Sequence, residues 1–333
     1  MFTKVFKNER YMILFNANSG LEILTGINGH GDPFVTDLPT LLDIGIMGTC
    51  QNKCRFCYQG HTDEPNMTLK NFMSIIDQVK HHVTQVALGG RGDPNKHENF
   101  KEIIEYCRKN NVVPNYTTSG INLTDDEIEI SKMCGAVAVS DYEWVDTYEA
   151  LTRLIKAGIK TNIHQILSLK TFEKCTQILE GRNYWERYDN CFQAPFPVDK
   201  LNAVIFLLFK PQGAGKDLGI SLEDRHFHFF SDLVFRPKST FKIGMDSCLV
   251  NHVIKYTTPT KIQAMSIDTC EGARMSAYIT PDMKMMPCSF GNKSMWGCDI
   301  QKQSIYDVWN IRKAFTLFRS RLEKQKNSCP YGL

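Results

Sequence analysis

Regular alternation of two kinds of segment is the feature that most constrains how this chain folds. Between residues 41 and 235, short apolar runs typical of β-strands alternate with longer segments that have the apolar period of an amphipathic helix. The strand candidates are 41–47, 83–88, 112–118, 135–140, 159–167 and 202–209. The helix candidates are 68–81, 97–110, 124–133, 146–157, 171–180 and 221–235. Continuous apolar strands that alternate with helices predict parallel pairing and right-handed crossovers.

The number of these units selects the architecture. Six βα units are too few to close an eight-stranded barrel. The sequence therefore predicts an α/β fold built on a partial, open-sided (β/α)6 TIM-like barrel, with its functional site at the C-terminal ends of the strands. Local signals agree with this assignment, because Thr124 and Glu127 have the spacing of a capping box and Gly158 stands where a glycine often ends a helix.

Two further segments flank the predicted barrel. Residues 1–40 contain a predicted β-hairpin over 11–27, with a glycine in its turn. Beyond the barrel the βα rhythm stops, and the chain becomes rich in Cys and Met with short strands and a helix around 304–323. We therefore expect a cap segment over 1–40, a barrel over 41–238, and a small Cys-rich α+β extension over 239–333.

Composition limits the classes of function. Hydrophobic residues make up 42% and charged residues 23% of the chain, as in ordinary globular proteins. A net charge of +3 without a basic block does not indicate a nucleic-acid partner. The N-terminus carries charges where a signal peptide needs an apolar core, and the most apolar run, 203–209, is too short to span a bilayer. The sequence predicts a cytoplasmic protein with neither a membrane nor a nucleic-acid partner.

A compact group of cysteines follows the first predicted barrel strand. Cys50, Cys54 and Cys57 have the spacing C-x3-C-x2-C. Three thiolates can hold three irons of a [4Fe–4S] cluster and leave the fourth iron open to a small molecule. Structural zinc is the alternative, with His61 near enough to complete the site, but this spacing is uncommon for zinc. The isolated cysteines, which we interpret as core thiols, are Cys107, Cys134, Cys175 and Cys191.

This motif resembles the signature of the radical S-adenosylmethionine (radical SAM) superfamily. The resemblance rests on Cys50, Cys54, Phe56 and Cys57, placed after the first strand of a βα series. It implies that the open iron chelates S-adenosylmethionine and that the reduced cluster cleaves it, giving a 5′-deoxyadenosyl radical that abstracts a substrate hydrogen. Phe56, between two ligands, can offer a flat apolar face to a nucleobase.

Later strand ends match the same family in order. Gly89 and Gly90 match its Gly-Gly-Glu motif, with the acid found at Asp93 after two extra residues. Polar residues follow the third, fourth and fifth strands, and the sixth strand runs into a glycine-containing loop at 211–215. The residues to which the resemblance gives cofactor-binding roles are Phe56, Gly89, Gly90, Asp93, Ser119, Ser140 and Gln165.

A second group of cysteines lies in the extension. Cys270 and Cys288 flank a predicted hairpin that turns at Pro281-Asp282, so the two thiols approach the same end. This resembles the SPASM/twitch extensions of the same superfamily, although Met283 replaces the family's glycine. The resemblance implies one auxiliary [4Fe–4S] cluster, and the alternative is a module whose thiols are paired or idle. Its implied ligands are Cys248, Cys270, Cys288 and Cys329, with Cys298 as a substitute for Cys248 or Cys329.

The resemblance predicts a radical SAM enzyme that abstracts a hydrogen from a peptide or protein side chain, leading to crosslinking, epimerisation or oxidation. Its electron donor is expected to be a flavodoxin or ferredoxin. Two alternatives stay open: a radical SAM enzyme that acts on a small molecule or cofactor precursor, and a non-catalytic iron–sulfur redox sensor. The hairpin at 11–27 can offer an edge strand to a peptide, although a barrel-end cap is the simpler interpretation. Candidate proton or hydrogen-atom donors are Tyr58, His164, Cys191 and Cys298.

Overall fold

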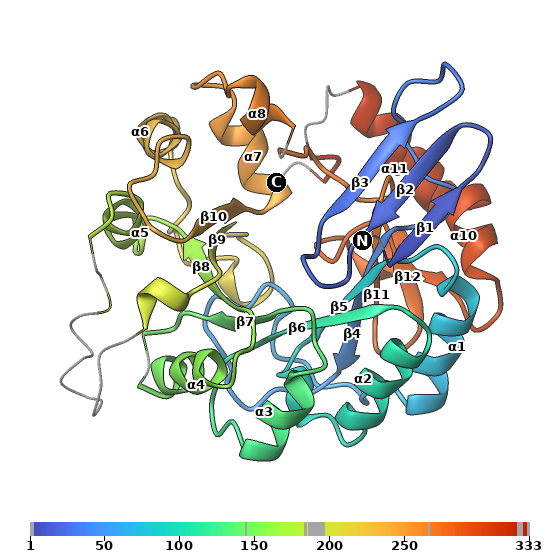
Figure 1. Ribbon diagram of the computed structural model, residues 1–333, viewed down its shortest axis with the longest axis horizontal. Helices are drawn as coiled ribbons and strands as arrows, with labels where there is room; N and C mark the ends of the chain where they lie inside the picture. Colours follow the sequence, from blue (N-terminus) through green and yellow to red (C-terminus); the bar gives the residue numbers. More distant parts are fainter. Residues whose placement is uncertain are drawn as a thin grey trace.

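The computed structural model describes residues 3–143, 145–182, 185, 197–265, 267–324 and 329–331. At its centre is a curved ten-stranded sheet in the order β10-β9-β8-β7-β6-β5-β4-β11-β12-β13 (Figure 1). The predicted parallel strands are all present, each pairing with the next in register. They are β4 (Leu41–Met47), β5 (Gln85–Gly90), β6 (Val113–Thr118), β7 (Val137–Ser140), β8 (Thr161–Leu167) and β9 (Ala203–Leu208).

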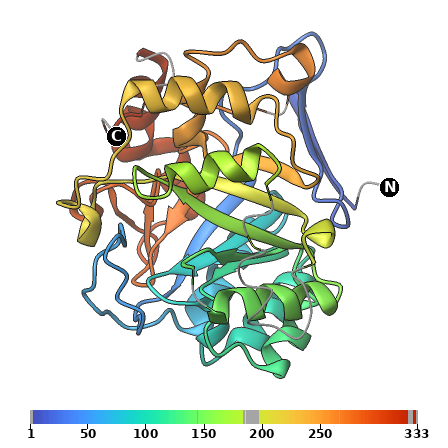
Figure 2. The same cartoon turned by 90° about the vertical axis from the view of Figure 1, so that its left-hand side faces the viewer.

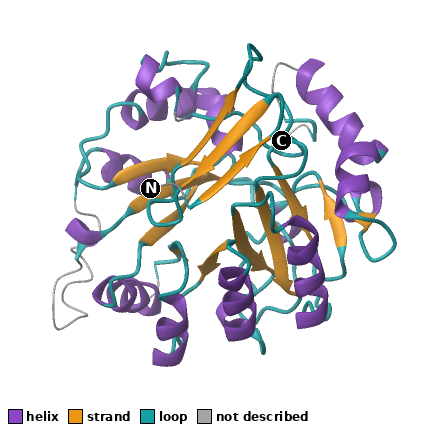
Figure 3. Ribbon diagram, turned by 45° about the vertical axis from the view of Figure 1, so that its right-hand side comes forward, coloured by secondary structure: helices purple, strands orange, loops and turns teal. Residues whose placement is uncertain are grey.

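Helices cover the outer side of this sheet (Figures 1 and 3). Each overlaps a predicted segment, and Thr124 and Glu127 form the expected capping box at the start of one of them. The buried apolar residues of strands and helices join in one core between the two layers. These helices are α1 (Leu69–Val79), α2 (Phe100–Lys109), α3 (Asp125–Ser131), α4 (Val145–Lys156), α5 (Phe172–Leu179) and α6 (Asp224–Val234).

The extension adds two parallel strands that the alternation did not predict. Strand β10 (Lys242–Met245) pairs with β9, and β11 (Ser276–Ile279) pairs with β4, so each lengthens one end of the parallel sheet. The predicted hairpin is confirmed, since β11 pairs antiparallel with β12 (Lys284–Met286), which in turn pairs with β13 (Cys298–Asp299). The predicted boundary between the barrel and the extension, at residue 239, therefore falls within one continuous sheet and one core. The division into these two domains stays a prediction.

Short helices complete the extension. The single helix expected over 304–323 is divided in two, because Arg312 has an extended backbone with φ −68° and ψ 136°. No helix in the described part of the chain is long and apolar enough to cross a membrane. The helices are α7 (Ser247–Val253), α8 (Lys261–Ala264), α9 (Lys293–Trp296), α10 (Ile305–Ile311) and α11 (Lys313–Lys324).

The N-terminal segment forms a separate antiparallel sheet of β1 (Lys4–Lys7), β2 (Tyr11–Phe15) and β3 (Glu22–Gly26). The β2–β3 hairpin is the predicted one, and β1 adds an edge strand to it. Lys4 donates a 2.6 Å hydrogen bond to the Lys80 carbonyl, which precedes β5. The sheet thus caps the N-terminal end of the barrel, whereas the loop after β4 lies at the opposite end (Figure 2).

Small inward-facing residues leave space inside the barrel. Side chains alternate along each strand, so that one set packs against the helices and the other faces the lumen. Ala87, Gly89, Thr117 and Ser140 occupy lumen positions on β5, β6 and β7. Because none of them is large, the barrel contains a cavity of about 460 Å³ that opens at the C-terminal ends of the strands.

Candidate functional site

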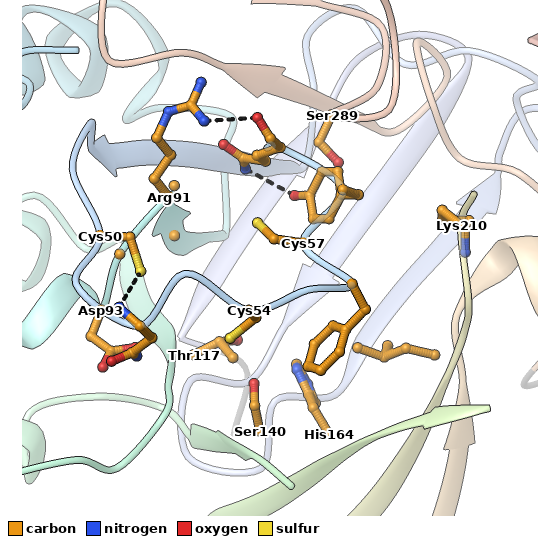
Figure 4. Close-up of a pocket in the computed structure, with 18 of the residues that line it drawn as sticks. Cys50, Cys54, Cys57, Arg91, Asp93, Thr117, Ser140, His164, Lys210 and Ser289 are labelled. Atoms are coloured by element: carbon orange, nitrogen blue, oxygen red, sulfur yellow. Dashed lines mark hydrogen bonds between the residues drawn. The ribbon is translucent and has the colours of Figure 1, made fainter. Parts of the chain in front are cut away.

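The three cysteines of the opening motif line this cavity. Cys50, Cys54 and Cys57 lie on the loop that follows β4, at the C-terminal mouth of the barrel (Figure 4). The Asn52 amide donates to the Cys50 sulfur at 3.4 Å. The sequence placed these thiols at the mouth, and the structure brings all of them to one cavity there.

The thiols have unfavourable surroundings for an uncompensated negative charge. Burial, together with the charges of Cys50 and Cys57, raises the pKa of Cys54 to about 11. Burial also raises the pKa of Cys57. Thiolates crowded in this way need a cationic partner, and a metal cluster that displaces their protons supplies one. Among the described residues, no group of three or more His, Cys, Asp or Glu side chains has the arrangement needed to bind one metal ion.

Two contacts hold the cysteine loop in place. The Arg91 guanidinium donates to the carbonyls of Gln59 at 2.7 Å and Gly60 at 3.0 Å. On the other side, the Ala214 amide donates to the Cys57 carbonyl at 2.9 Å. Sequence reasoning treated Arg91 only as part of a two-residue insertion before Asp93, and the structure gives it a positioning role.

The predicted Gly-Gly turn passes close to the start of the cysteine loop. Gly90 has φ +120°, and a Cβ at this position would lie 2.3 Å from the Met47 carbonyl oxygen. Only glycine permits that conformation and that approach. Gly89 and Gly90 both line the cavity, so the backbone of this turn is accessible to a ligand there.

Asp93 and Ser119 form one unit rather than two separate contacts. Asp93 lines the cavity and accepts hydrogen bonds from the Ser119 amide at 2.7 Å and from the Ser119 hydroxyl. Burial raises the pKa of Asp93, and these hydrogen bonds act in the opposite direction. Ser119 does not line the cavity and reaches it only through Asp93, so the cofactor-binding role given to Ser119 stays a prediction.

Two predicted residues flank the cavity as expected, and one does not. Phe56 and Ser140 line it, with the Phe56 ring 5.4 Å from that of Tyr142. Gln165 is wholly buried, and its side-chain amide donates to the Ile166 carbonyl at 3.0 Å. Strand alternation turns Gln165 away from the lumen, and it does not line the cavity, so the cofactor-binding role given to it stays a prediction.

The neighbour of Gln165, His164, faces the cavity instead (Figure 4). Burial lowers the pKa of His164 to about 4, so its ring is neutral at physiological pH. Tyr58, another candidate donor, also lines the cavity, and burial raises its pKa to about 12. Cys191 lies outside the described residues. Cys107 and Cys175 are fully buried, as expected of core thiols.

The second cysteine group meets at another cavity, of about 320 Å³. Cys298, on β13, does not line this cavity, and its sulfur lies 4.0 Å from the Trp296 carbonyl oxygen. Burial raises the pKa of Cys248 to about 12 and that of Cys270 to about 11. The thiols that line this cavity are Cys248, Cys270, Cys288 and Cys329.

The position of the missing family glycine keeps the glycine-like conformation. Met283 has φ +64°, which is the left-handed region, and its side chain is only 2% exposed. The hairpin turn between Cys270 and Cys288 therefore forms without glycine.

An aromatic side chain separates the two cavities. Phe290 lines both of them, and its ring centroid lies 4.5 Å from that of Tyr58. The Lys210 ammonium lies 4.8 Å from the Phe290 ring and forms a 2.8 Å ion pair with Asp246. The sequence carried no signal for this arrangement, because Phe290 and Lys210 stand in no recognisable motif.

Known proteins resemble both the motif region and the whole fold. The model of the radical SAM superfamily matches residues 44–142. A curated relative from Pyrococcus furiosus, the tungsten-containing aldehyde ferredoxin oxidoreductase cofactor-modifying protein, is 25% identical over 145 residues. That match covers 42% of this chain but only 38% of the relative's own length.

Solved structures extend the resemblance to nearly the full chain. Streptococcus suis SuiB bound to S-adenosylmethionine aligns with a TM-score of 0.71 and 12% identity, over 96% of this chain and 90% of SuiB. Native anSMEcpe with bound AdoMet and Cp18Cys peptide aligns with a TM-score of 0.59 and 14% identity, over 84% and 82% of the two chains. At such low identity these alignments establish the fold, a TIM-like partial barrel with a parallel central sheet.

Residues 44–142 thus carry the cysteine motif, the Gly-Gly turn and the family match on the expected barrel. The chain is therefore an enzyme that carries a radical SAM domain at residues 44–142.

Proposed function

We propose that this enzyme cleaves S-adenosylmethionine reductively and uses the resulting radical to abstract a hydrogen atom from a peptide or protein side chain. The observation that carries the proposal is the group of Cys50, Cys54 and Cys57 at the mouth of the barrel cavity. A [4Fe–4S] cluster held by these three thiols would supply the electron for cleavage. A flavodoxin or ferredoxin is the expected source of that electron.

The chain's own residues would bind and orient the cofactor. The backbone of Gly89 and Gly90 and the carboxylate of Asp93 offer hydrogen-bonding groups beside the thiols. Phe56, packed against Tyr142, offers an apolar surface and helps to exclude water from the cavity. Arg91 fixes the loop that carries the thiols.

We further propose one auxiliary [4Fe–4S] cluster in the second cavity. Its support is the convergence of Cys248, Cys270, Cys288 and Cys329 on one space, which supplies the four thiols that such a cluster requires. The nearby Phe290 would separate the two clusters.

The peptide substrate is supported by the known structures with this fold. SuiB has been solved bound to the precursor peptide SuiA, and anSMEcpe with the Cp18Cys peptide. A cofactor precursor is the second candidate, because the Pyrococcus furiosus relative is described as a cofactor-modifying protein. Isotope transfer distinguishes the two candidates. If the substrate is a peptide, 5′-deoxyadenosine should gain deuterium when the enzyme is given a deuterated peptide and should not when it is given a deuterated small molecule.

Iron content tests both clusters. Anaerobically reconstituted wild type should contain about eight irons per chain, and the variant with Cys50, Cys54 and Cys57 all changed to Ala about four. About four irons against none would remove the auxiliary cluster. After dithionite reduction, wild type should form 5′-deoxyadenosine and Cys54→Ala should not; unchanged formation in that variant would overturn the assignment of the site.

A further inference from the structure

Asp43 is an acid in an otherwise apolar barrel strand. It lies in the middle of β4, opposite Ala87 on β5 and Tyr278 on β11. The residue is half-buried and lines the same cavity as the three thiols. Asp43 precedes the end of β4 by four residues, which corresponds to about 13 Å along the strand. It therefore lies at the inner end of the cavity, well below the cysteine loop.

Within the described part of the chain, the Asp43 carboxylate has no hydrogen-bond or ion-pair partner. The cations inside the cavity are committed elsewhere, since Arg91 donates to two carbonyls and Lys210 pairs with Asp246. Lys53 also lines the cavity but is exposed at its rim. A carboxylate that faces a protein cavity without a partner is costly, so its retention there calls for a ligand that compensates its charge.

The groups around Asp43 do not compensate its charge. Beyond the effect of burial, the Asp43 charge further raises the pKa values of Tyr58, Tyr278 and Glu271. Burial raises the pKa of Asp43 itself to about 6, which leaves it ionised at neutral pH. None of these neighbours is a cation, so the charge of Asp43 has no opposite charge among them.

Aromatic side chains line the same cavity as Asp43, between it and the cysteine loop. The Gln59 amide donates to the hydroxyls of Tyr58 at 3.0 Å and Tyr278 at 3.4 Å, which fixes both rings beside the lumen. Phe290 packs against Tyr58. A carboxylate with aromatic walls is the combination that binds an organic cation, through an ion pair and cation–π contacts.

We propose that Asp43 binds a cationic side chain of the substrate, the ammonium of a lysine or the guanidinium of an arginine. This inference rests on the proposed peptide-modifying function and adds a substrate class to it. Asp43 would hold the charged end at the inner end of the cavity. The aliphatic stem then extends toward the mouth, where the thiols and the bound cofactor lie.

Binding of small probes to the reconstituted, S-adenosylmethionine-loaded enzyme tests the proposal by isothermal titration calorimetry. The probes are n-butylguanidinium, n-butylammonium and the neutral isostere n-butylurea. We expect one cation to bind with a Kd on the order of 1 mM and n-butylurea to bind at least about tenfold more weakly. Comparison of the two cations distinguishes an arginine from a lysine.

The variants isolate the charge of Asp43. Asp43→Asn should weaken binding of the preferred cation about tenfold, to the level of n-butylurea, whereas Asp43→Glu should retain part of it. Asp63→Asn is the matched control, because Asp63 lines the exposed rim of the same cavity, and it should leave binding unchanged. Iron content and S-adenosylmethionine affinity are measured for every variant to show that the site is intact.

Three outcomes would overturn the inference: equal binding of n-butylurea and the cations to wild type, full cation binding by Asp43→Asn, or loss of S-adenosylmethionine affinity in Asp43→Asn. The last result would assign Asp43 to the cofactor. Failure here is distinguishable from failure of the proposed function, because wild-type formation of 5′-deoxyadenosine with dithionite requires no cationic substrate.

Discussion

Gly213 is the point at which the loop after β9 meets the cysteine loop, so we predict that Gly213→Ala displaces the thiols. Gly213 has φ +55°, and a Cβ there would lie 2.4 Å from the Tyr58 carbonyl oxygen and 2.5 Å from that of Cys57. Both atoms are backbone and cannot rotate away. The two loops would have to separate by roughly 1 Å to reach ordinary contact distance.

Gly219 provides a matched control within the same connection. It has φ +61°, but a Cβ there would meet nothing within 4 Å. The left-handed backbone costs roughly 1–2 kcal/mol in either alanine variant. Only Gly213→Ala also weakens the hydrogen bond from the Ala214 amide to the Cys57 carbonyl, worth about 1 kcal/mol, and moves the ligand loop itself.

Iron analysis and urea unfolding separate the two effects. Both variants should be destabilised by roughly 1–2 kcal/mol, with about 1 kcal/mol more for Gly213→Ala. Gly219→Ala should keep wild-type iron and 5′-deoxyadenosine formation. Gly213→Ala should lose the iron of the first cluster, about half of the total, and form little 5′-deoxyadenosine. If the two variants retain equal iron and equal turnover, the close approach does not position the thiols and the reasoning fails.

Three further predictions concern single side chains. Burial raises the pKa of Asp43 from 3.8 to about 6, so the wild-type apoprotein should lose stability as the pH rises from about 4 to about 6. Asp43→Asn removes this loss. In urea unfolding, the variant should be about 3 kcal/mol more stable than wild type at pH 7 and equally stable near pH 4. Arg91→Gln removes a positive charge that lowers the pKa of Cys57, so alkylation of that thiol in the apoprotein should require higher pH, as peptide mapping with iodoacetamide measures. Met283→Gly removes the strain of a left-handed backbone, which should stabilise the fold by about 1–2 kcal/mol. It also removes a buried side chain, which should destabilise the fold by about 2–5 kcal/mol, so urea unfolding should show net destabilisation.

The sequence predicted the barrel well because its signals are local and repeated. Each strand from β4 to β9 is a continuous apolar run, and each helix from α1 to α6 has a clear apolar period. Strand β10 and the parallel pairing of β11 with β4 were missed for a physical reason. Strands β10 and β11 have four residues each, and their place in the sheet depends on pairing with β9 and β4, which are distant in sequence.

The candidate site was predictable only where function depends on spacing. Cys50, Cys54 and Cys57 lie close together in sequence, whereas the side chain of Gln165 has a direction that only the register of β8 determines. Asp43 was overlooked because a single acid within an apolar run does not disrupt a strand pattern. Its lack of a partner is a property of the folded barrel.

The order of the strands also gives the proposed auxiliary cluster a structural reason. The central sheet ends at β10 on one side and at the β11–β13 hairpin on the other, and within the described residues no hydrogen-bonded ladder joins these ends. Cys248 follows β10 at the start of α7, whereas Cys270 and Cys288 flank the β11–β12 hairpin. Thiols from both ends of the sheet therefore line one cavity. Bonds from these thiols to a common cluster would join the two ends of the sheet, which backbone hydrogen bonds do not join. This connection would lie beside Phe290, which also lines the cavity of Cys50, Cys54 and Cys57.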